Sequence, residues 1–343
     1  MLHLEVKGVN IIKKRKINNN IMYQFFLIFL VSFIATFLFL PWIIPKLKRA
    51  KIVGIDVNKP NKVEIPEMGG FGIIFGFSSG ILFAIALSTF FHVFTNNFHL
   101  NFILAAFITI LLMALIGIFD DLFVMHQAIK AILPIFASLP LVSIRAGVTT
   151  MTLPFFGTIN FGIFYILLLI PIGVAGASNV TNMLAGFNGL EAGMGLVACS
   201  SLAFIAFKIH SIESLIVLLS MIGALLAFLF YNWYPSRVLI GDIGTLSIGA
   251  VIASSVIIGN FETAGLIVII PYAIDFVIKA INKFPSKNWW GIYRKGKLYS
   301  PDKPIGFCQL IMKIFGGISE RNLVLVLIFI ELIFGIIAIS TVI

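Results

Sequence analysis

Long hydrophobic runs follow one another along almost the whole chain, and short polar connections separate them. Each run has the roughly 20 apolar residues that an α-helix needs to cross about 30 Å of hydrocarbon. The pattern predicts ten membrane-spanning helices, at residues 21–45, 69–91, 102–119, 128–144, 161–178, 194–209, 214–233, 245–261, 263–281 and 322–343. We therefore expect an all-α, polytopic integral membrane protein with about ten transmembrane helices.

Composition supports a membrane protein over a soluble one. Hydrophobic residues make up 60% of the chain and charged residues 11%, and the mean hydropathy is +1.09. A single soluble core cannot absorb that much apolar surface. We expect an N-terminal extension at residues 1–20 and one ten-span domain at 21–343, with a long loop at about 282–321.

The distribution of Lys and Arg predicts which ends of the helices face the cytoplasm. The connections "KLKRAKIVGIDVNKPNKVEIPEM" and 282–321 hold most of the positive charge, and the predicted spans place both on one side. Short loops rich in Lys and Arg mark the cytoplasmic side, so we assign this side to the cytoplasm of a plasma-membrane protein. Arg145 and Lys208 are the only cations in the opposite loops.

The segment "KKRK" at 13–16 disagrees with this orientation, because it would lie outside. One hypothesis is that translation begins at Met22, directly before the first span. Residues 1–21 do not have the small-residue cleavage site of a signal peptide.

The sequence gives little support for a zinc site, a haem site or a nucleic-acid partner. Cys199 and Cys308 are isolated, and the five histidines show neither HxH nor HExxH spacing, which argues against a zinc or haem site. The net charge of +10 comes from residues in short connections between spans, where anionic lipid and orientation explain it better than nucleic acid does.

Polar residues gather at the predicted cytoplasmic ends of the spans. In "GIFDDLFVMHQAIK", Asp120 and Asp121 end one span and Lys130 begins the next. On one continuous helix Asp121 and Lys130 would point about 180° apart, so convergence requires a turn between them. Two hydrated acids at a helix end are an equally good interpretation of this stretch alone.

The most polar of these stretches is "NVTNMLAGFNGLEAGMG". Asn179 and Asn182 are three residues apart and would present two amide oxygens on one helix face. Gly186 and the Asn188-Gly189 pair predict a turn. Glycine lets the backbone approach a phosphate, and amide and carboxylate oxygens suit Mg²⁺, so a nucleotide site is indicated. The alternative is a polar loop with an asparagine cap.

Two further stretches give weak signals alone. Asp242 in "GDIGTLSIG" precedes a span and is equally well interpreted as the cap of its first turn. In "NKPNKVEIPEMGG", Glu67 is the acid nearest to a span entry, next to Pro66 and a pair of glycines.

Taken together, these stretches resemble the polyprenyl-phosphate N-acetylhexosamine-1-phosphate transferases of glycosyltransferase family 4. "NVTNMLAGFNGLEAG" is similar to the NxxNxLAGxNGLEAG pattern of the archaeal and eukaryotic UDP-GlcNAc:dolichyl-phosphate branch; bacterial branches usually carry Asp where Ala185 stands. The Asp pair with Lys130, "GDIGTLSIG" and "DVNKPNKVEIPEMGG" add three matches in the right order. The resemblance covers about residues 56–242 and, more loosely, the last hundred residues.

The resemblance implies a reaction and a set of partners. The family transfers N-acetylglucosamine-1-phosphate, or a related N-acetylhexosamine-1-phosphate, from a UDP-sugar to polyprenyl or dolichyl phosphate in the membrane. The products are the lipid diphosphate sugar and UMP, and the reaction is the first membrane step of an N-glycosylation type of glycan assembly. Mg²⁺, with Mn²⁺ as a substitute, is the implied cofactor, and a homodimer is an implied assembly.

The resemblance also implies roles for individual residues. Asn182 and Asp242 would hold the metal ion, Asp120 and Asp121 would face the lipid phosphate, and Lys130 would neutralise phosphate charge. Positions that match the substrate-binding residues are Glu67, Asn179, Gly186 and Asn188.

One departure from the family concerns the sugar. Eukaryotic members carry an Arg-His-Arg motif in the last cytoplasmic loop, whereas "FPSKNWWGIYRKGKL" has no histidine. Lys287, Asn288 and Arg294 are the candidates that remain there.

A cation-coupled transporter is the alternative function, with Asp275 and Glu331 as the acids of an ion path. For Asp275 the preferred interpretation is a helix-packing acid that bonds to a neighbour or lies near Lys279 at its cytoplasmic end. Two observations weigh against a transporter: no inverted repeat of broken spans is visible, and most acids cluster at one membrane face rather than at the midplane.

Overall fold

The structure is a computed structural model that describes residues 19–59, 61–94, 98–123, 125–153, 157–285 and 288–342. Residues 1–18, which include the "KKRK" segment, lie outside the described residues, and so does the sugar-site candidate Lys287.

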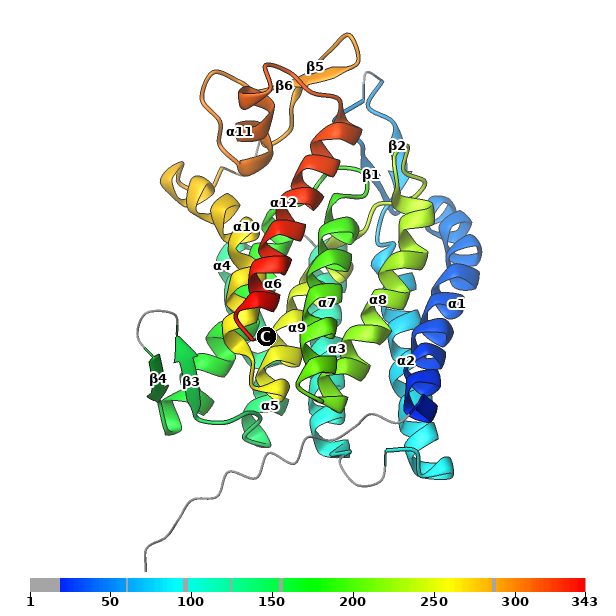
Figure 1. The fold of residues 1–343 in the computed structure, drawn as a ribbon. Helices are drawn as coiled ribbons and strands as arrows, with labels where there is room; N and C mark the ends of the chain where they lie inside the picture. Colours follow the sequence, from blue (N-terminus) through cyan, green and yellow to red (C-terminus); the bar gives the residue numbers. More distant parts are fainter. Residues whose placement is uncertain are drawn as a thin grey trace, which may run out of the picture.

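Long apolar helices make up most of the described chain (Figure 1). Nine of them are long and apolar enough to cross a membrane within the described ranges. They are α1 (Asn19–Arg49), α2 (Gly70–Phe91), α3 (Leu100–Phe123), the π-helical turn η1 (Tyr165–Leu169) continued by α6 (Ile170–Met183), α7 (Leu190–Lys208), α8 (Ile212–Asn232), α9 (Gly241–Gly259), α10 (Glu262–Ile281) and α12 (Glu320–Ser340). The prediction of a polytopic, mostly helical membrane protein is confirmed.

The span predicted at 128–144 has a different form. It is divided into α4 (Gln127–Ala137) and α5 (Leu139–Ser143), which meet at Ser138. Pro140 is the second residue of α5, and a proline cannot donate the hydrogen bond that a continuing helix would need at that position. The apolar segment is therefore shorter than a full span.

Three two-stranded antiparallel hairpins lie outside the all-α prediction. They pair β1 (Val53–Ile55) with β2 (Glu64–Pro66), β3 (Thr150–Leu153) with β4 (Gly157–Asn160), and β5 (Ile292–Arg294) with β6 (Lys297–Tyr299). Strands of three or four residues are too short to show a clear alternation in sequence. The connection between α10 and α12 holds the third hairpin and the short helix α11 (Phe307–Ile314).

Several helices extend beyond the predicted spans into polar sequence. Helix α3 continues to Phe123 and so includes Asp120 and Asp121, and α6 continues to Met183 and includes Asn182. Helix α9 begins at Gly241, directly before Asp242. The polar residues therefore lie on the terminal turns of membrane helices, where rigid backbone fixes their positions.

Helix α9 is the central helix and is buried along nearly all of its length. Glycines allow its neighbours to come close. A Cβ atom on Gly117 of α3 would lie 2.5 Å from the Ile243 nitrogen, and one on Gly70 of α2 would lie 2.4 Å from the Gly244 nitrogen. These contacts bring the ends of α2 and α3 against the first turn of α9.

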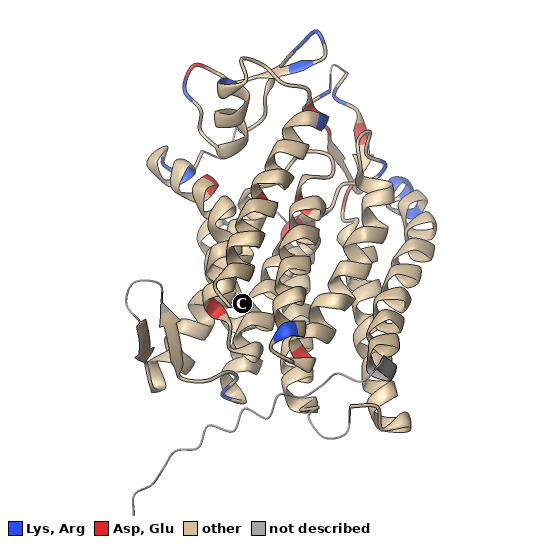
Figure 2. Ribbon diagram, in the orientation of Figure 1, with Lys and Arg blue, Asp and Glu red and all other residues tan. Residues whose placement is uncertain are grey.

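Charged residues gather at one end of the helices, the upper end in Figure 2. This end carries the β1–β2 and β5–β6 hairpins and α11, whereas the β3–β4 hairpin and α5 lie at the other (Figure 1). Among the described Lys and Arg residues, Arg145 and Lys208 belong to the connections at the other end. All the connections that were predicted to share one side do so.

The contact between α3 and α9 gives a test of the fold. Gly117→Ala places a methyl group where the α9 backbone lies, and overpacking of this kind costs about 1–3 kcal/mol. We expect a lower unfolding midpoint for the detergent-purified protein. Gly173→Ala on α6 is the matched control, because its Cβ meets no atom within 4 Å. Equal midpoints for the two variants would contradict the close contact.

Candidate active site

A cleft of about 920 Å³ is lined by residues of α4, α6, α9 and α10 and of the connections at the charged end. It contains seven of the residues named from sequence: Glu67, Lys130, Asn179, Asn182, Gly186, Asn188 and Asp242. Residues far apart in the chain therefore share one cavity.

The ammonium group of Lys130 joins two helices at this cleft. It forms ion pairs with Asp120 of α3 and Asp242 of α9. The Asp120 side chain is 8% exposed and also accepts the Met125 N–H at 2.8 Å. The predicted turn between Asp121 and Lys130 is present, since α3 ends at Phe123 and α4 begins at Gln127.

Asp121 has a different position from that of its neighbour. Its carboxylate accepts the Asp242 N–H at 2.9 Å and the Ile243 N–H at 3.4 Å, so it caps the start of α9. A carboxylate at a helix N-terminus satisfies free N–H groups and complements the helix dipole. Asp242 is thus free of the capping role that its sequence position suggested, and its side chain points to Lys130.

Asn182 completes this group of polar side chains. With its amide nitrogen towards α9, the nitrogen lies 2.9 Å from Asp242 Oδ1 and 2.8 Å from Thr245 Oγ1, and the amide oxygen lies 2.9 Å from Lys130 Nζ. Amide orientation is assigned from hydrogen bonding, and this one satisfies all three contacts. Asn182 and Asp242 are therefore at the same end of the bundle and in direct contact.

The other asparagine of α6 has a local role. The Asn179 amide donates to the Ala131 carbonyl of α4 at 3.2 Å and to the Ala175 carbonyl at 2.9 Å. It therefore ties α4 to α6 beside the cleft.

Glu67 lies at the cleft wall near the entry of α2. Burial raises the pKa of its carboxyl group above the ordinary value, because loss of water disfavours the charged form.

The loop after α6 turns with the geometry that its glycines allow. Gly186 and Gly189 have φ values of 106° and 83°. A Cβ on Gly186 would also lie 2.2 Å from the ring of Trp289. Only glycine satisfies both conditions at this position.

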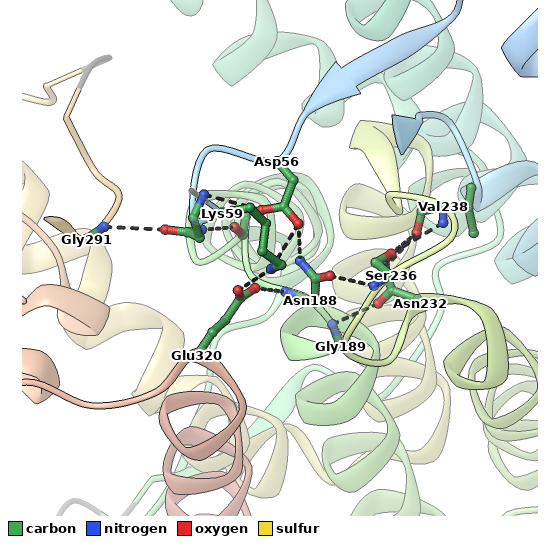
Figure 3. A network of polar contacts seen from close by, with 11 residues as sticks. Asp56, Lys59, Asn188, Gly189, Asn232, Ser236, Val238, Gly291 and Glu320 are labelled. Atoms are coloured by element: carbon green, nitrogen blue, oxygen red, sulfur yellow. Dashed lines mark hydrogen bonds and ion pairs between the residues drawn. The ribbon is translucent and has the colours of Figure 1, made fainter. Parts of the chain in front are cut away.

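A buried network holds this loop to three others (Figure 3). The Asn188 amide donates to Asp56 at 2.9 Å and accepts the Ser236 N–H at 2.7 Å, and its backbone N–H donates to Glu320 at 2.9 Å. Lys59 forms ion pairs with Asp56 and with Glu320. Both polar atoms of the Asn188 side chain already bond within the protein, so its amide positions the loop.

Comparison with known proteins identifies the family of the chain. The sequence profile of glycosyl transferase family 4 matches residues 103–260, which include Asp120, Lys130, Asn182 and Asp242. A protein of Saccharolobus solfataricus named "Putative UDP-N-acetylglucosamine--dolichyl-phosphate N-acetylglucosaminephosphotransferase" is 38% identical over 90% of this chain and 94% of its own length. The chain belongs to glycosyl transferase family 4.

More distant relatives extend across the family. The UDP-N-acetylglucosamine--dolichyl-phosphate N-acetylglucosaminephosphotransferase of Dictyostelium discoideum is 28% identical over 84% of this chain and 81% of its own length. The phospho-N-acetylmuramoyl-pentapeptide-transferase of Enterococcus faecalis is 31% identical over 62% of this chain and 67% of that protein. The resemblance stated from sequence is confirmed, and the transporter alternative is set aside.

Some residues of this family 4 chain lie away from the position expected for them. Arg294 is exposed on the β5–β6 hairpin and does not line the cleft. Asn288 has its backbone carbonyl bonded to the Gln309 side chain at 2.6 Å. Asp275, one of the two transporter acids, pairs with Lys279 at 2.7 Å and accepts the Phe307 N–H. Glu331 is buried in α12 and its carboxyl oxygens have no hydrogen-bond partner within the described part of the chain.

Sequence reasoning missed two features of the site. Lys279 and Trp289 line the cleft, and the Asp56–Lys59–Glu320 ion pairs hold its loops. The sequence signal for Lys279 was a lysine on the last turn of a span, four residues after Asp275. No sequence signal joins Glu320 to Lys59, because 261 residues separate them.

The network around Asn188 gives a stability prediction. Glu320→Ala leaves the half-buried Lys59 with one partner fewer and the Asn188 N–H without an acceptor. Removal of one partner from a buried pair costs up to about 3–5 kcal/mol. We expect a clear fall in the unfolding midpoint. Glu320→Gln keeps an acceptor for the Asn188 N–H and should lower the unfolding midpoint less. Glu64→Ala on the exposed face of β2 is the control. An unfolding midpoint of Glu320→Ala equal to that of Glu64→Ala would refute the network.

Proposed function

We propose that this protein transfers N-acetylglucosamine-1-phosphate from UDP-N-acetylglucosamine to a polyprenyl phosphate such as dolichyl phosphate. The observation that carries the proposal is the position of Lys130 and Asp242, which line one cleft and form an ion pair there, while Lys130 also pairs with Asp120 at the end of α3. The relatives support this choice of substrates, because they are named for UDP-N-acetylglucosamine and dolichyl phosphate.

The reaction joins two anions. An oxygen of the lipid phosphate attacks the β-phosphorus of the UDP-sugar, and the bond from that phosphorus to the bridging oxygen breaks. UMP leaves with the electron pair of that bond. Phosphoryl transfer requires mainly positioning and charge neutralisation from a protein, and Lys130 supplies a fixed positive charge at the cleft wall.

A general base is not needed for this step. The second pKa of a phosphate monoester is about 6, so the acceptor is mostly a dianion at neutral pH. Asp120 is engaged by Lys130 and the Met125 N–H, and Asp121 by the start of α9. We infer that both aspartates orient the site.

The residues present fit a magnesium ion. The Lys130 ammonium group already lies where two carboxylates and the Asn182 amide oxygen meet, which shows that these oxygen atoms converge on positive charge. Among the described residues no group of three or more His, Cys, Asp or Glu is arranged for a metal, and Mg²⁺ typically takes one or two carboxylates together with phosphate and water oxygens.

We propose that Asp242 and Asn182 hold this ion when substrate is bound. It would supply Lewis-acid neutralisation of the diphosphate; Mn²⁺ has the same preference for oxygen ligands.

Two further predictions belong to this proposal. The end that carries the cleft faces the cytoplasm, supported by the Lys and Arg residues gathered there (Figure 2). Homodimerisation stays a prediction from the family resemblance.

The transferase activity is tested with purified protein, radiolabelled UDP-N-acetylglucosamine, Mg²⁺ and a polyprenyl phosphate. We expect labelled lipid and UMP in equal amounts. Asp242→Asn and Lys130→Gln should each lower kcat about 100-fold or more, as loss of a charge-stabilising group does. Lys297→Gln on the exposed β6 strand is the control. Undiminished turnover in either variant, or no lipid product from the wild type, would refute the proposal.

Metal dependence is a separate test. Removal of divalent ions with a chelator should abolish transfer, and Mg²⁺ or Mn²⁺ should restore it. Asn182→Ala should raise the Mg²⁺ concentration needed for half-maximal activity, because one oxygen ligand is lost. Full activity in the presence of chelator would show that Lys130 alone neutralises the phosphates.

A further inference from the structure

The cleft contains a second lysine with no assigned role. Of the described residues that line it, two are basic, Lys130 and Lys279. They belong to different helices, α4 and α10. The proposed reaction brings a diphosphate and a phosphate monoester together in this cleft, and Lys130 is already shared between two carboxylates.

Lys279 is held in place by contacts on both sides. Its ammonium group lies 2.7 Å from Asp275 Oδ2, one turn earlier on α10, and donates to the Met183 carbonyl at the end of α6. The side chain is 14% exposed. The Met183 carbonyl accepts one ammonium N–H, and Asp275 Oδ2 lies at ion-pair distance without accepting a hydrogen bond. At least one of the three N–H groups is therefore without a protein acceptor in these contacts, and the residue lines the cleft.

Apolar side chains line the cleft together with Lys279. Phe276 of α10 and Phe284, shortly after α10, are among them, as are Val180 and Met183 of α6. Phe276 and Phe284 are also among the exposed large hydrophobic residues, 37% and 55% exposed. The acids and amides of the loop side, Asp56, Glu67 and Asn188, are contributed by other elements. An anion with a hydrocarbon tail suits the Lys279 side of the cleft better than a nucleotide does.

We propose that Lys279 binds the phosphate of the polyprenyl acceptor. This inference rests on the proposed function and adds to it a residue for one of the two substrates. Lys130 serves the reacting diphosphate and Lys279 the phosphate monoester that enters from the membrane, so that each anion meets its own fixed cation. Asp275 then has two tasks: it orients the Lys279 ammonium group, and it caps the start of α11 through the Phe307 N–H.

The test must separate phosphate binding from neutralisation of the buried Asp275. Lys279→Gln removes the cation but leaves the carboxylate unpaired, which costs stability. Asp275→Asn/Lys279→Gln removes both charges and keeps an acceptor for the Phe307 N–H. Lys279→Arg keeps the charge, and Lys283→Gln, an exposed lysine one turn further along the chain, is the matched control.

The measurements are the KM for undecaprenyl phosphate, the KM for UDP-N-acetylglucosamine and the equilibrium binding of radiolabelled undecaprenyl phosphate in detergent. A lost charged hydrogen bond weakens binding about tenfold or more. We expect the single Gln variant and the double variant to show this loss for the lipid with an unchanged donor KM. Lys279→Arg should recover most of the binding, and Lys283→Gln should match the wild type.

Two outcomes overturn the inference. Normal lipid binding in the double variant would show that Lys279 serves only to neutralise Asp275. A rise in the donor KM with normal lipid binding would assign Lys279 to the nucleotide sugar. The binding measurement needs no turnover, so a wild-type protein that binds the lipid through Lys279 but transfers nothing would refute the proposed function alone.

Discussion

The arrangement of the site depends on one ammonium group that three polar side chains contact. Lys130 forms ion pairs with Asp120 and Asp242, and the Asn182 amide lies against both partners of the second pair. These side chains belong to four helices. Because the Asp and Asn side chains are short, the helices that carry them must pack closely for the contacts to form. Gly117 and Gly70 provide that packing by letting α3 and α2 approach α9 without side chains between them. The chemistry therefore depends on glycine contacts that have no chemical function of their own.

The position of the site at the helix ends solves an energetic problem. Charged groups are costly in hydrocarbon unless they are paired or hydrated. Asp120 and Lys130 satisfy each other, Asp121 satisfies the first N–H groups of α9, and Asp275 is paired with Lys279. On the loop side, the ion pairs of Lys59 hold the loop of Asn188 in the same way (Figure 3). These charged groups of the site and of its supporting loops are thus all paired or hydrogen-bonded at the ends of the helices.

Much of this could be predicted from sequence, and the limits have physical causes. Hydrophobic runs fix the long helices, because crossing a bilayer requires length and apolarity together. The turn between Asp121 and Lys130 follows from helix geometry once the two residues are taken to converge. The role of Asp121 does not, since two adjacent carboxylates look identical until the partner helix is placed. The pairing of Lys59 with Glu320 and the exposed position of Arg294 likewise follow from tertiary packing. The division of the fourth predicted span at Ser138 follows from a local break in the helix, which a hydropathy average over the span does not show.

The central claim is that Asp242 and Asn182 receive a divalent ion beside the Lys130 ammonium group when substrate is bound. The most direct measurement is an experimental structure with UDP-N-acetylglucosamine and Mn²⁺, whose anomalous scattering locates the ion. The account predicts one peak in contact with the carboxylate of Asp242 and the amide oxygen of Asn182, with the diphosphate on its open side. A peak elsewhere, or a bound donor with no ion between these side chains, would contradict it.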